Sequence, residues 1–198
     1  MKNLKNILIG LVILVVAIGA IVIVFNGNDL EENVGKEKLI MVTEAGFAPY
    51  EFYDGDEIVG VDVEIAKKIA EKTGKELEIK DTDFDSIINE VKTGKADFAA
   101  AGLSITEERL EEVDFSIEYA VSKQVIVVKN ESTVESIDSL NGKKVAVQLG
   151  TIADLVLSDE YKDIELVQHK KYLLAVEDLK ADKVDAIVLD SLPAEFIR

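Results

Sequence analysis

From residue 38 onward, the spacing of apolar residues alternates between the periods of β-strands and α-helices. An apolar run of strand length, Lys38–Val42, precedes a segment in which Val61, Ile65 and Ile69 recur at helical spacing. The next segments read as a strand at 76–80, a short helix at 83–94 and a small-residue strand at 96–102. The order strand, helix, strand, helix, strand predicts a parallel sheet covered by helices.

The second half of the chain repeats this plan. It reads as a strand at 143–150, a helix from Thr151, a strand at 164–168, a helix at 172–183 and a strand at 184–190. Residues 88–102 and 176–190 share the order helix, lysine-bearing turn and strand. We therefore expect an α/β fold of two lobes, 38–120 and 121–190, joined by the extended run 115–130.

The N-terminus is a separate segment. Residues Ile7–Phe25 are uncharged and almost wholly apolar, and as a helix they would extend about 28 Å, roughly the thickness of a bilayer core. Lys2 and Lys5 precede this run and acidic residues follow it, which places the rest of the chain outside the cell. We expect residues 1–25 to be a membrane anchor, or alternatively an uncleaved or cleaved signal segment, and 26–37 to be a polar tether.

The composition excludes several classes of function. The net charge of −17 argues against nucleic acid as a partner, and we read the acidity as a solvated surface. The chain has no cysteine and a single histidine, His169, so we expect no metal site, no cofactor and no nucleophilic catalytic site.

One arginine stands out in the stretch AAGLSITEERLEEVDFS (100–116). Every basic residue of the chain is lysine except Arg109 and Arg198. Thr106 is a good helix N-cap, so Arg109 falls in the first helical turn, where a cation is disfavoured. Arginine presents a planar charged fork that matches a carboxylate or phosphate. Arg109 is therefore predicted to bind an anion; the alternative is a local ion pair with Glu112 or Asp114.

The predicted strand ends gather further polar residues. In open α/β sheets, ligands bind beyond the carboxyl ends of the strands. Gly102 and Ser104 follow one strand, Thr151 opens a helix after another, and Asp190 ends a third. An anion site and a cation site facing each other across a cleft would suit a zwitterion. The alternatives are ordinary helix caps at Thr151 and Asp190.

At these residues the chain resembles the periplasmic-type (type II) solute-binding proteins of the polar amino-acid class, the receptors of ABC importers. The resemblance implies a two-lobed, hinged fold preceded here by the N-terminal hydrophobic helix. The most specific block is GLSITEER. The matching segments, in the order of the family, are TEAGFAPYEF (43–52), GVDVEIAKKIA (60–70), DFDSIINEVKTGKADFAAAGLSITEER (83–109), VDFS (113–116), LNGKKVAVQLGT (140–151) and VDAIVLD (184–190).

The resemblance implies a role for each site residue. Arg109 would hold the ligand α-carboxylate with help from the backbone at Ser104 and Thr151. The α-ammonium would be held by the Gly102 carbonyl, the Ser104 hydroxyl and Asp190. The side-chain pocket would be lined by Glu44, Phe47, Phe84 and Gln148, although Phe47 and Phe84 could instead be core residues. A carboxylate beside aromatic rings suits a basic side chain, and an amide would also fit.

The resemblance also implies partners and location. We expect a monomer on the outer face of the membrane, held by its N-terminal helix, or a periplasmic or secreted protein if that segment is cleaved. It would deliver its amino acid to a membrane permease and would close around the ligand by a hinge.

The chain departs from the family in two ways. It lacks the cysteine that carries a lipid in family lipoproteins, and a spanning helix could replace that tether. Residues 191–198 read as the start of a return crossing to the first lobe, with the remainder absent. We therefore expect an exposed apolar edge and lower stability than in a version extended to family length. Two other functions use this fold: a dehydratase for prephenate-like acids, with Glu44 as acid or base, and a ligand-sensing input domain of a membrane receptor.

Overall fold

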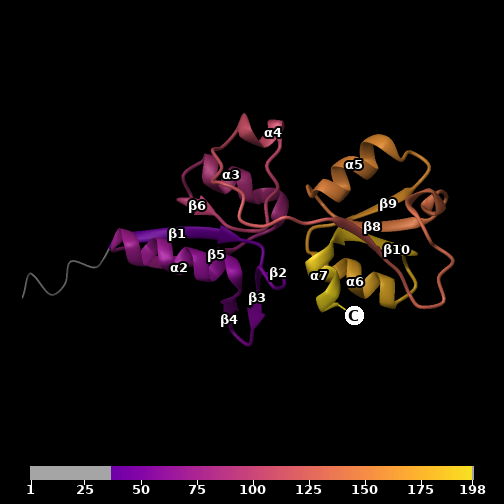
Figure 1. The fold of residues 1–198 in the computed structure, drawn as a ribbon, viewed down its shortest axis with the longest axis horizontal. Coiled ribbons are helices and arrows are strands. Elements are labelled where there is room, and N and C mark those ends of the chain that lie inside the picture. The colour runs from indigo at the N-terminus through magenta and orange to yellow at the C-terminus, as the bar shows by residue number, and fades with distance from the viewer. Residues whose placement is uncertain (1–36, 198) are drawn as a thin grey trace, which may run out of the picture. The chain divides into compact units, whose positions relative to one another are not determined.

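The computed structural model describes residues 37–197 (Figure 1). The predicted membrane anchor, and the tether up to residue 36, lie outside the described residues. Within the described part, no helix is long and apolar enough to cross a membrane.

A three-stranded parallel sheet forms the centre of the first lobe, which we take as residues 38–120. Strand β1 (Lys38–Thr43) lies between β5 (Glu76–Asp81) and β6 (Phe98–Ala99). Helix α2 (Val61–Thr73) covers one face and the short helices η1 (Phe84–Ser86) and α3 (Ile87–Lys92) cover the other (Figure 1). The alternation of side chains along β1 divides the core accordingly, because Met41 packs against α2 and Val42 against α3.

An antiparallel sheet that was not predicted from the sequence follows β1. It consists of β2 (Gly46–Phe47), β3 (Glu51–Asp54) and β4 (Glu57–Val59), in that order. Gly60 connects it to α2 with a φ of 128°, and a Cβ atom there would lie 2.2 Å from the Tyr50 carbonyl oxygen. Glycine is therefore required at this close approach.

The second lobe contains a four-stranded sheet in the order β7 (Gln124–Val127), β10 (Ala186–Asp190), β8 (Lys144–Gln148) and β9 (Glu165–His169). Strands β8, β9 and β10 are parallel, and β7 is antiparallel to β10. Helix α5 (Ile152–Glu160) packs on one face, together with η2 (Ile137–Leu140), and α6 (Tyr172–Lys180) and α7 (Ser191–Phe196) pack on the other (Figure 1). The sheet is covered on both faces, which explains its continuous apolar runs.

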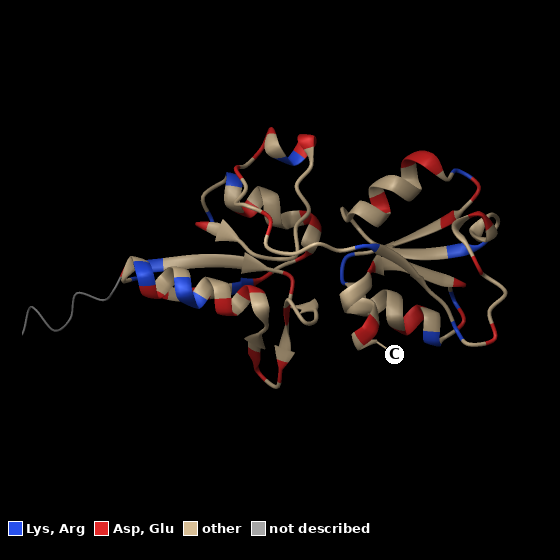
Figure 2. Cartoon of the chain, viewed as in Figure 1, with Lys and Arg blue, Asp and Glu red and all other residues tan. Residues whose placement is uncertain are grey.

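The predicted α/β fold and the order of its main strands and helices are confirmed, with two differences of length. The small-residue strand predicted at 96–102 is paired only at Phe98–Ala99. Of the extended run 115–130, only β7 is a strand, and its antiparallel pairing with β10 fixes the crossing segment to the second lobe. The boundary between lobes at residue 120 stays a prediction. Acidic and basic residues are spread over both lobes (Figure 2).

The fully buried Ile187 provides a test of this core. It lies in β10 opposite Val127 of β7 and Ala146 of β8. We expect Ile187→Ala to lower the free energy of unfolding by about 2–5 kcal/mol, because it removes buried methyl groups and leaves a cavity. The control is Leu173→Ala on the exposed side of α6, which should change it by no more than about 0.5 kcal/mol. Urea unfolding followed by circular dichroism measures both, and equal effects would contradict the described packing.

Candidate functional site

The carboxyl ends of the strands in both sheets meet at one cavity. All nine residues predicted for the site line it, and so do two that were not predicted. The lining residues are Glu44, Phe47, Glu51, Phe84, Gly102, Ser104, Arg109, Gln148, Thr151, Ile152 and Asp190. The open volume is about 20 Å³, room for about one water molecule, so an amino acid can enter only if the surrounding groups move. The ligand-binding role of each residue stays a prediction.

Arg109 spans the cavity from the short helix α4 (Glu107–Leu110). Thr106 caps this helix as predicted, with its hydroxyl accepting a hydrogen bond from the Arg109 N–H at 3.2 Å. The guanidinium donates from Nη1 to the Ser104 carbonyl at 2.7 Å and from Nη2 to the Gly150 carbonyl at 2.9 Å. Ser104 belongs to the first lobe and Gly150 to the second, so one side chain joins the two.

Arg109 has no carboxylate partner within ion-pair distance among the described residues. The alternative partner Glu112 pairs instead with Lys92. The guanidinium lies 5.8 Å from the centre of the Phe84 ring, and Arg109 as a residue is 9% exposed. Burial lowers the pKa of Arg109, partly offset by Glu108, but arginine stays charged in proteins. A buried cation held only by carbonyl oxygens has the capacity to bind an anion.

Gly102 lies beneath the aromatic wall of the cavity. Its φ is 56°, and a Cβ atom would approach Phe47 Cε1 to 2.9 Å, so the ring packs directly on the backbone. The Phe47 ring also stacks on Tyr50 at 5.9 Å. The Gly102 N–H donates to the buried Asp62 carboxylate at 3.1 Å, and the Tyr119 hydroxyl donates to the same oxygen at 3.0 Å. Asp62 thereby joins α2, the site loop and the segment that leads to the second lobe.

Three predicted residues come from the second lobe. Thr151 caps α5, because its hydroxyl oxygen accepts a hydrogen bond from the Asp154 N–H, and the same hydroxyl donates to the Gln148 carbonyl at 2.7 Å. Thr151 therefore both caps the helix and lines the cavity. Asp190 occupies the N-cap position of α7, but its side chain makes no capping hydrogen bond. Asp190 therefore has the cap position that was the alternative, without the capping hydrogen bond, and it also lines the cavity.

Two glutamates of the first lobe are buried at the cavity. Glu44 is 2% exposed and Glu51 is fully buried, and Glu44 Oε2 and both Glu51 oxygens lack a hydrogen-bond partner. Burial raises the pKa of both carboxyls; Lys171 offsets part of this at Glu44, while Asp62 adds to it at Glu51. Glu51 was not predicted from the sequence, although an acidic residue between Tyr50 and Phe52 was a usable signal.

Each lobe has a sheet whose parallel strands direct their carboxyl ends to a shared cavity, and this arrangement is that of a two-lobed solute-binding protein of type II. The chain belongs to the bacterial extracellular solute-binding proteins, family 3, which match residues 39–190.

Named relatives show what the chain is similar to. The arginine-binding extracellular protein ArtP of Bacillus subtilis is 40% identical over 81% of this chain, and the alignment covers 64% of ArtP. The chain thus spans slightly less than two-thirds of that relative's length. Holo ArgBP from T. maritima is 42% identical with a TM-score of 0.78, covering 80% of this chain and 71% of that one. An ancestral arginine-binding protein bound to glutamine is 39% identical with a TM-score of 0.78, covering 81% and 73%.

The raised pKa of Glu51 predicts a pH-dependent loss of stability. A carboxyl whose folded pKa is raised keeps its full contribution below the ordinary pKa of about 4.3 and loses it as the pH rises through the folded value. Relative to Glu51→Gln, the native protein should therefore melt at progressively lower temperature as the pH rises above the ordinary pKa of a glutamate. The control is Glu57→Gln, an exposed change on β4, which should stay parallel to the native protein. A difference in melting temperature between Glu51→Gln and the native protein that did not change with pH would contradict the raised pKa of Glu51.

Proposed function

We propose that this protein binds a free amino acid in the cavity and that Arg109 holds its α-carboxylate. The observation that carries the proposal is the buried guanidinium with carbonyl partners on both sides and no carboxylate within ion-pair distance in the described residues. A ligand carboxylate would supply the missing negative charge and could accept two parallel hydrogen bonds. The relatives named for arginine binding support the same class of ligand.

The α-ammonium has its own partners on the cavity wall. The Asp190 carboxylate supplies charge, and the Gly102 carbonyl and the Ser104 hydroxyl supply hydrogen-bond acceptors. A ligand gripped from both lobes would favour the closed arrangement, because its binding energy depends on both sets of contacts.

A basic ligand side chain is the best match for the part of the cavity beside Glu44. Glu44 Oε2 is buried without a hydrogen-bond partner, and a bound cation would supply one. Phe47 lines the same cavity and could place its ring beside a cation, whereas the Phe84 ring lies beside the Arg109 guanidinium. An amide side chain is the alternative, since an ancestral relative that is named arginine-binding also holds glutamine.

We further propose that the protein is a non-catalytic receptor that delivers its amino acid to the permease of an ABC importer. Membership of the extracellular solute-binding family supports this role. The protein would act as a monomer outside the cytoplasm, held at the membrane by residues 1–25.

A thermal-shift screen of the 198-residue protein against the twenty amino acids, with prephenate included, tests the proposal. A specific ligand at about a thousand times its dissociation constant stabilises by about 4 kcal/mol, and each kcal/mol raises the midpoint by about 2–4 °C. We expect such a shift for one or a few amino acids and its loss in Arg109→Lys, since lysine lacks the bidentate fork. Glu112→Gln, a charge change that follows α4 and faces Lys92, should keep the response. A shift with prephenate alone would contradict the amino-acid receptor and favour the dehydratase alternative.

Glu44→Gln tests the preference for a basic side chain. Removing the carboxylate should weaken L-arginine binding at least about tenfold relative to L-glutamine, because a desolvated charge pair is lost for only one of the two ligands. Isothermal titration calorimetry measures both affinities. Equal losses for the two ligands, or equal binding of alanine and arginine by the native protein, would contradict a basic ligand.

A further inference from the structure

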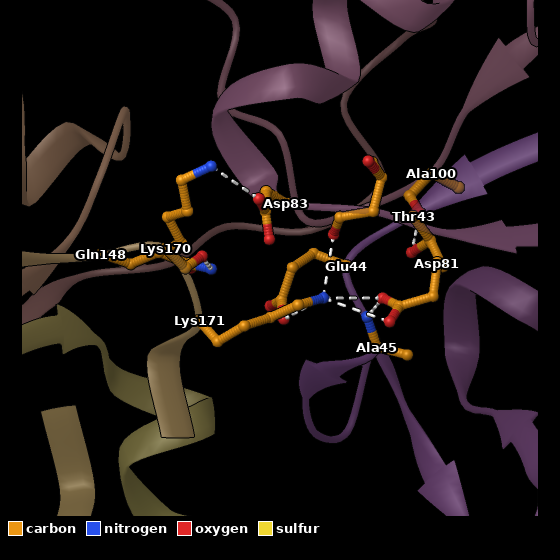
Figure 3. Close-up of polar contacts among 10 residues, drawn as sticks. Thr43, Glu44, Ala45, Asp81, Asp83, Ala100, Gln148, Lys170 and Lys171 are labelled. Atoms are coloured by element: carbon orange, nitrogen blue, oxygen red, sulfur yellow. Dashed lines mark hydrogen bonds and ion pairs between the residues drawn. The ribbon is translucent and has the colours of Figure 1, made fainter. Parts of the chain in front are cut away.

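Two lysines of the second lobe reach across to the first lobe beside the cavity. Lys170 and Lys171 directly follow β9, and Lys171 occupies the N-cap position of α6 without making a capping hydrogen bond. Cations are disfavoured at a helix N-terminus, so local preference does not explain them. Figure 3 shows both side chains extending toward acidic residues of the first lobe.

The Lys171 ammonium is held chiefly by Asp81. It donates to Asp81 Oδ1 at 3.0 Å, to Asp81 Oδ2 at 3.1 Å and to the Thr82 carbonyl at 3.0 Å (Figure 3). Asp81 is itself fixed, because its Oδ1 accepts the Ala45 N–H at 2.8 Å. Glu44 Oε1 lies farther from the ammonium, at 3.3 Å.

Glu44 is therefore only partly neutralised by Lys171. Its second oxygen, Oε2, is buried without a hydrogen-bond partner. Around the ammonium, the two carboxylates of Glu44 and Asp81 face one positive charge, which leaves one negative charge in excess. A singly charged basic side chain would balance that excess. However, it would bind Glu44 in the presence of a second cation, Lys171, that already lies 3.3 Å from the same carboxylate.

We propose that Lys171 is a specificity-determining residue: its ammonium competes with the cationic side chain of the ligand for Glu44 and thereby limits the preference for basic over amide amino acids. The inference rests on the proposed function and concerns the same cavity. Like charges a few ångströms apart in a partly desolvated site repel strongly enough to change affinity about tenfold or more.

Lys171 also holds the lobes together, and that role must be separated from competition. Closure acts on every ligand alike, because each is bound by the same closed arrangement. The ratio of L-arginine to L-glutamine affinity cancels this contribution and retains the effect of charge. Lys170 provides the matched control, since its ammonium bridges to Asp83 Oδ2 at 3.0 Å and no contact with Glu44 is recorded for its side chain.

The experiment compares L-arginine and L-glutamine affinities by isothermal titration calorimetry in the native protein, Lys171→Met, Lys170→Met and Asp81→Asn. Lys171→Met should raise the arginine-to-glutamine ratio about tenfold or more. Asp81→Asn should lower it, because Lys171 then has only Glu44 as a charged partner, while the amide oxygen can still accept the Ala45 N–H. Lys170→Met should change both affinities by the same factor.

The opposite changes of the affinity ratio in Lys171→Met and Asp81→Asn distinguish charge competition from a role in holding the lobes together. If Lys171 served only to hold the lobes together, Lys171→Met and Asp81→Asn would break the same bridge and leave the ratio unchanged; that result would overturn the inference. A fall of the ratio in Lys171→Met would also overturn it. If the native protein bound neither these ligands nor any other amino acid, the proposed function would fail as well, so the two failures are distinguishable.

Discussion

Ionised groups removed from water need partners, and this requirement dominates the organisation of the cavity. The buried Asp62 carboxylate accepts from the Gly102 N–H and the Tyr119 hydroxyl, and the buried Arg109 guanidinium donates to carbonyls of both lobes. Where partners are incomplete, as at Glu51, burial raises the pKa and favours the neutral form. The charges that are satisfied join elements of both lobes, and the unpartnered Glu44 Oε2 is the atom on which the proposed ligand preference depends.

The parallel sheets determine where these charges meet. Strands β1 and β5 of the first lobe and β8, β9 and β10 of the second each end at or next to a residue of the cavity or of the ion pairs made by Lys170 and Lys171, and β6 ends three residues before Gly102. Such strand ends offer loops whose side chains are free of the sheet ladder, while the helices on both faces keep water from the core. Rigid elements thus position a polar site that the loops alone could not hold.

The sequence predicted this arrangement where its signals were local. The strands and α2 followed from apolar periodicity, and Arg109 followed from an arginine in an unfavourable helical turn. The small antiparallel sheet was not predicted, because β2, β3 and β4 are too short for the alternation of apolar and polar residues to appear. Glu51 was not predicted for the same reason, since its burial depends on that small sheet. Lys171 was not predicted, because its long side chain reaches the end of a strand that is distant in the sequence. Its place at a helix N-terminus, where cations are disfavoured, was nevertheless the same signal that indicated Arg109.

The position of the site residues beyond the paired registers has an evolutionary consequence. Gln148 is the last paired residue of β8, and Thr151, three positions later, carries no sheet hydrogen bond, so an exchange at Thr151 leaves the ladder intact. The same holds for Glu44, which follows the last paired residue of β1. In such a scaffold, single substitutions at these positions can change the ligand preference while the sheet hydrogen bonds stay in place, so one fold can come to bind different nutrients in different descendants.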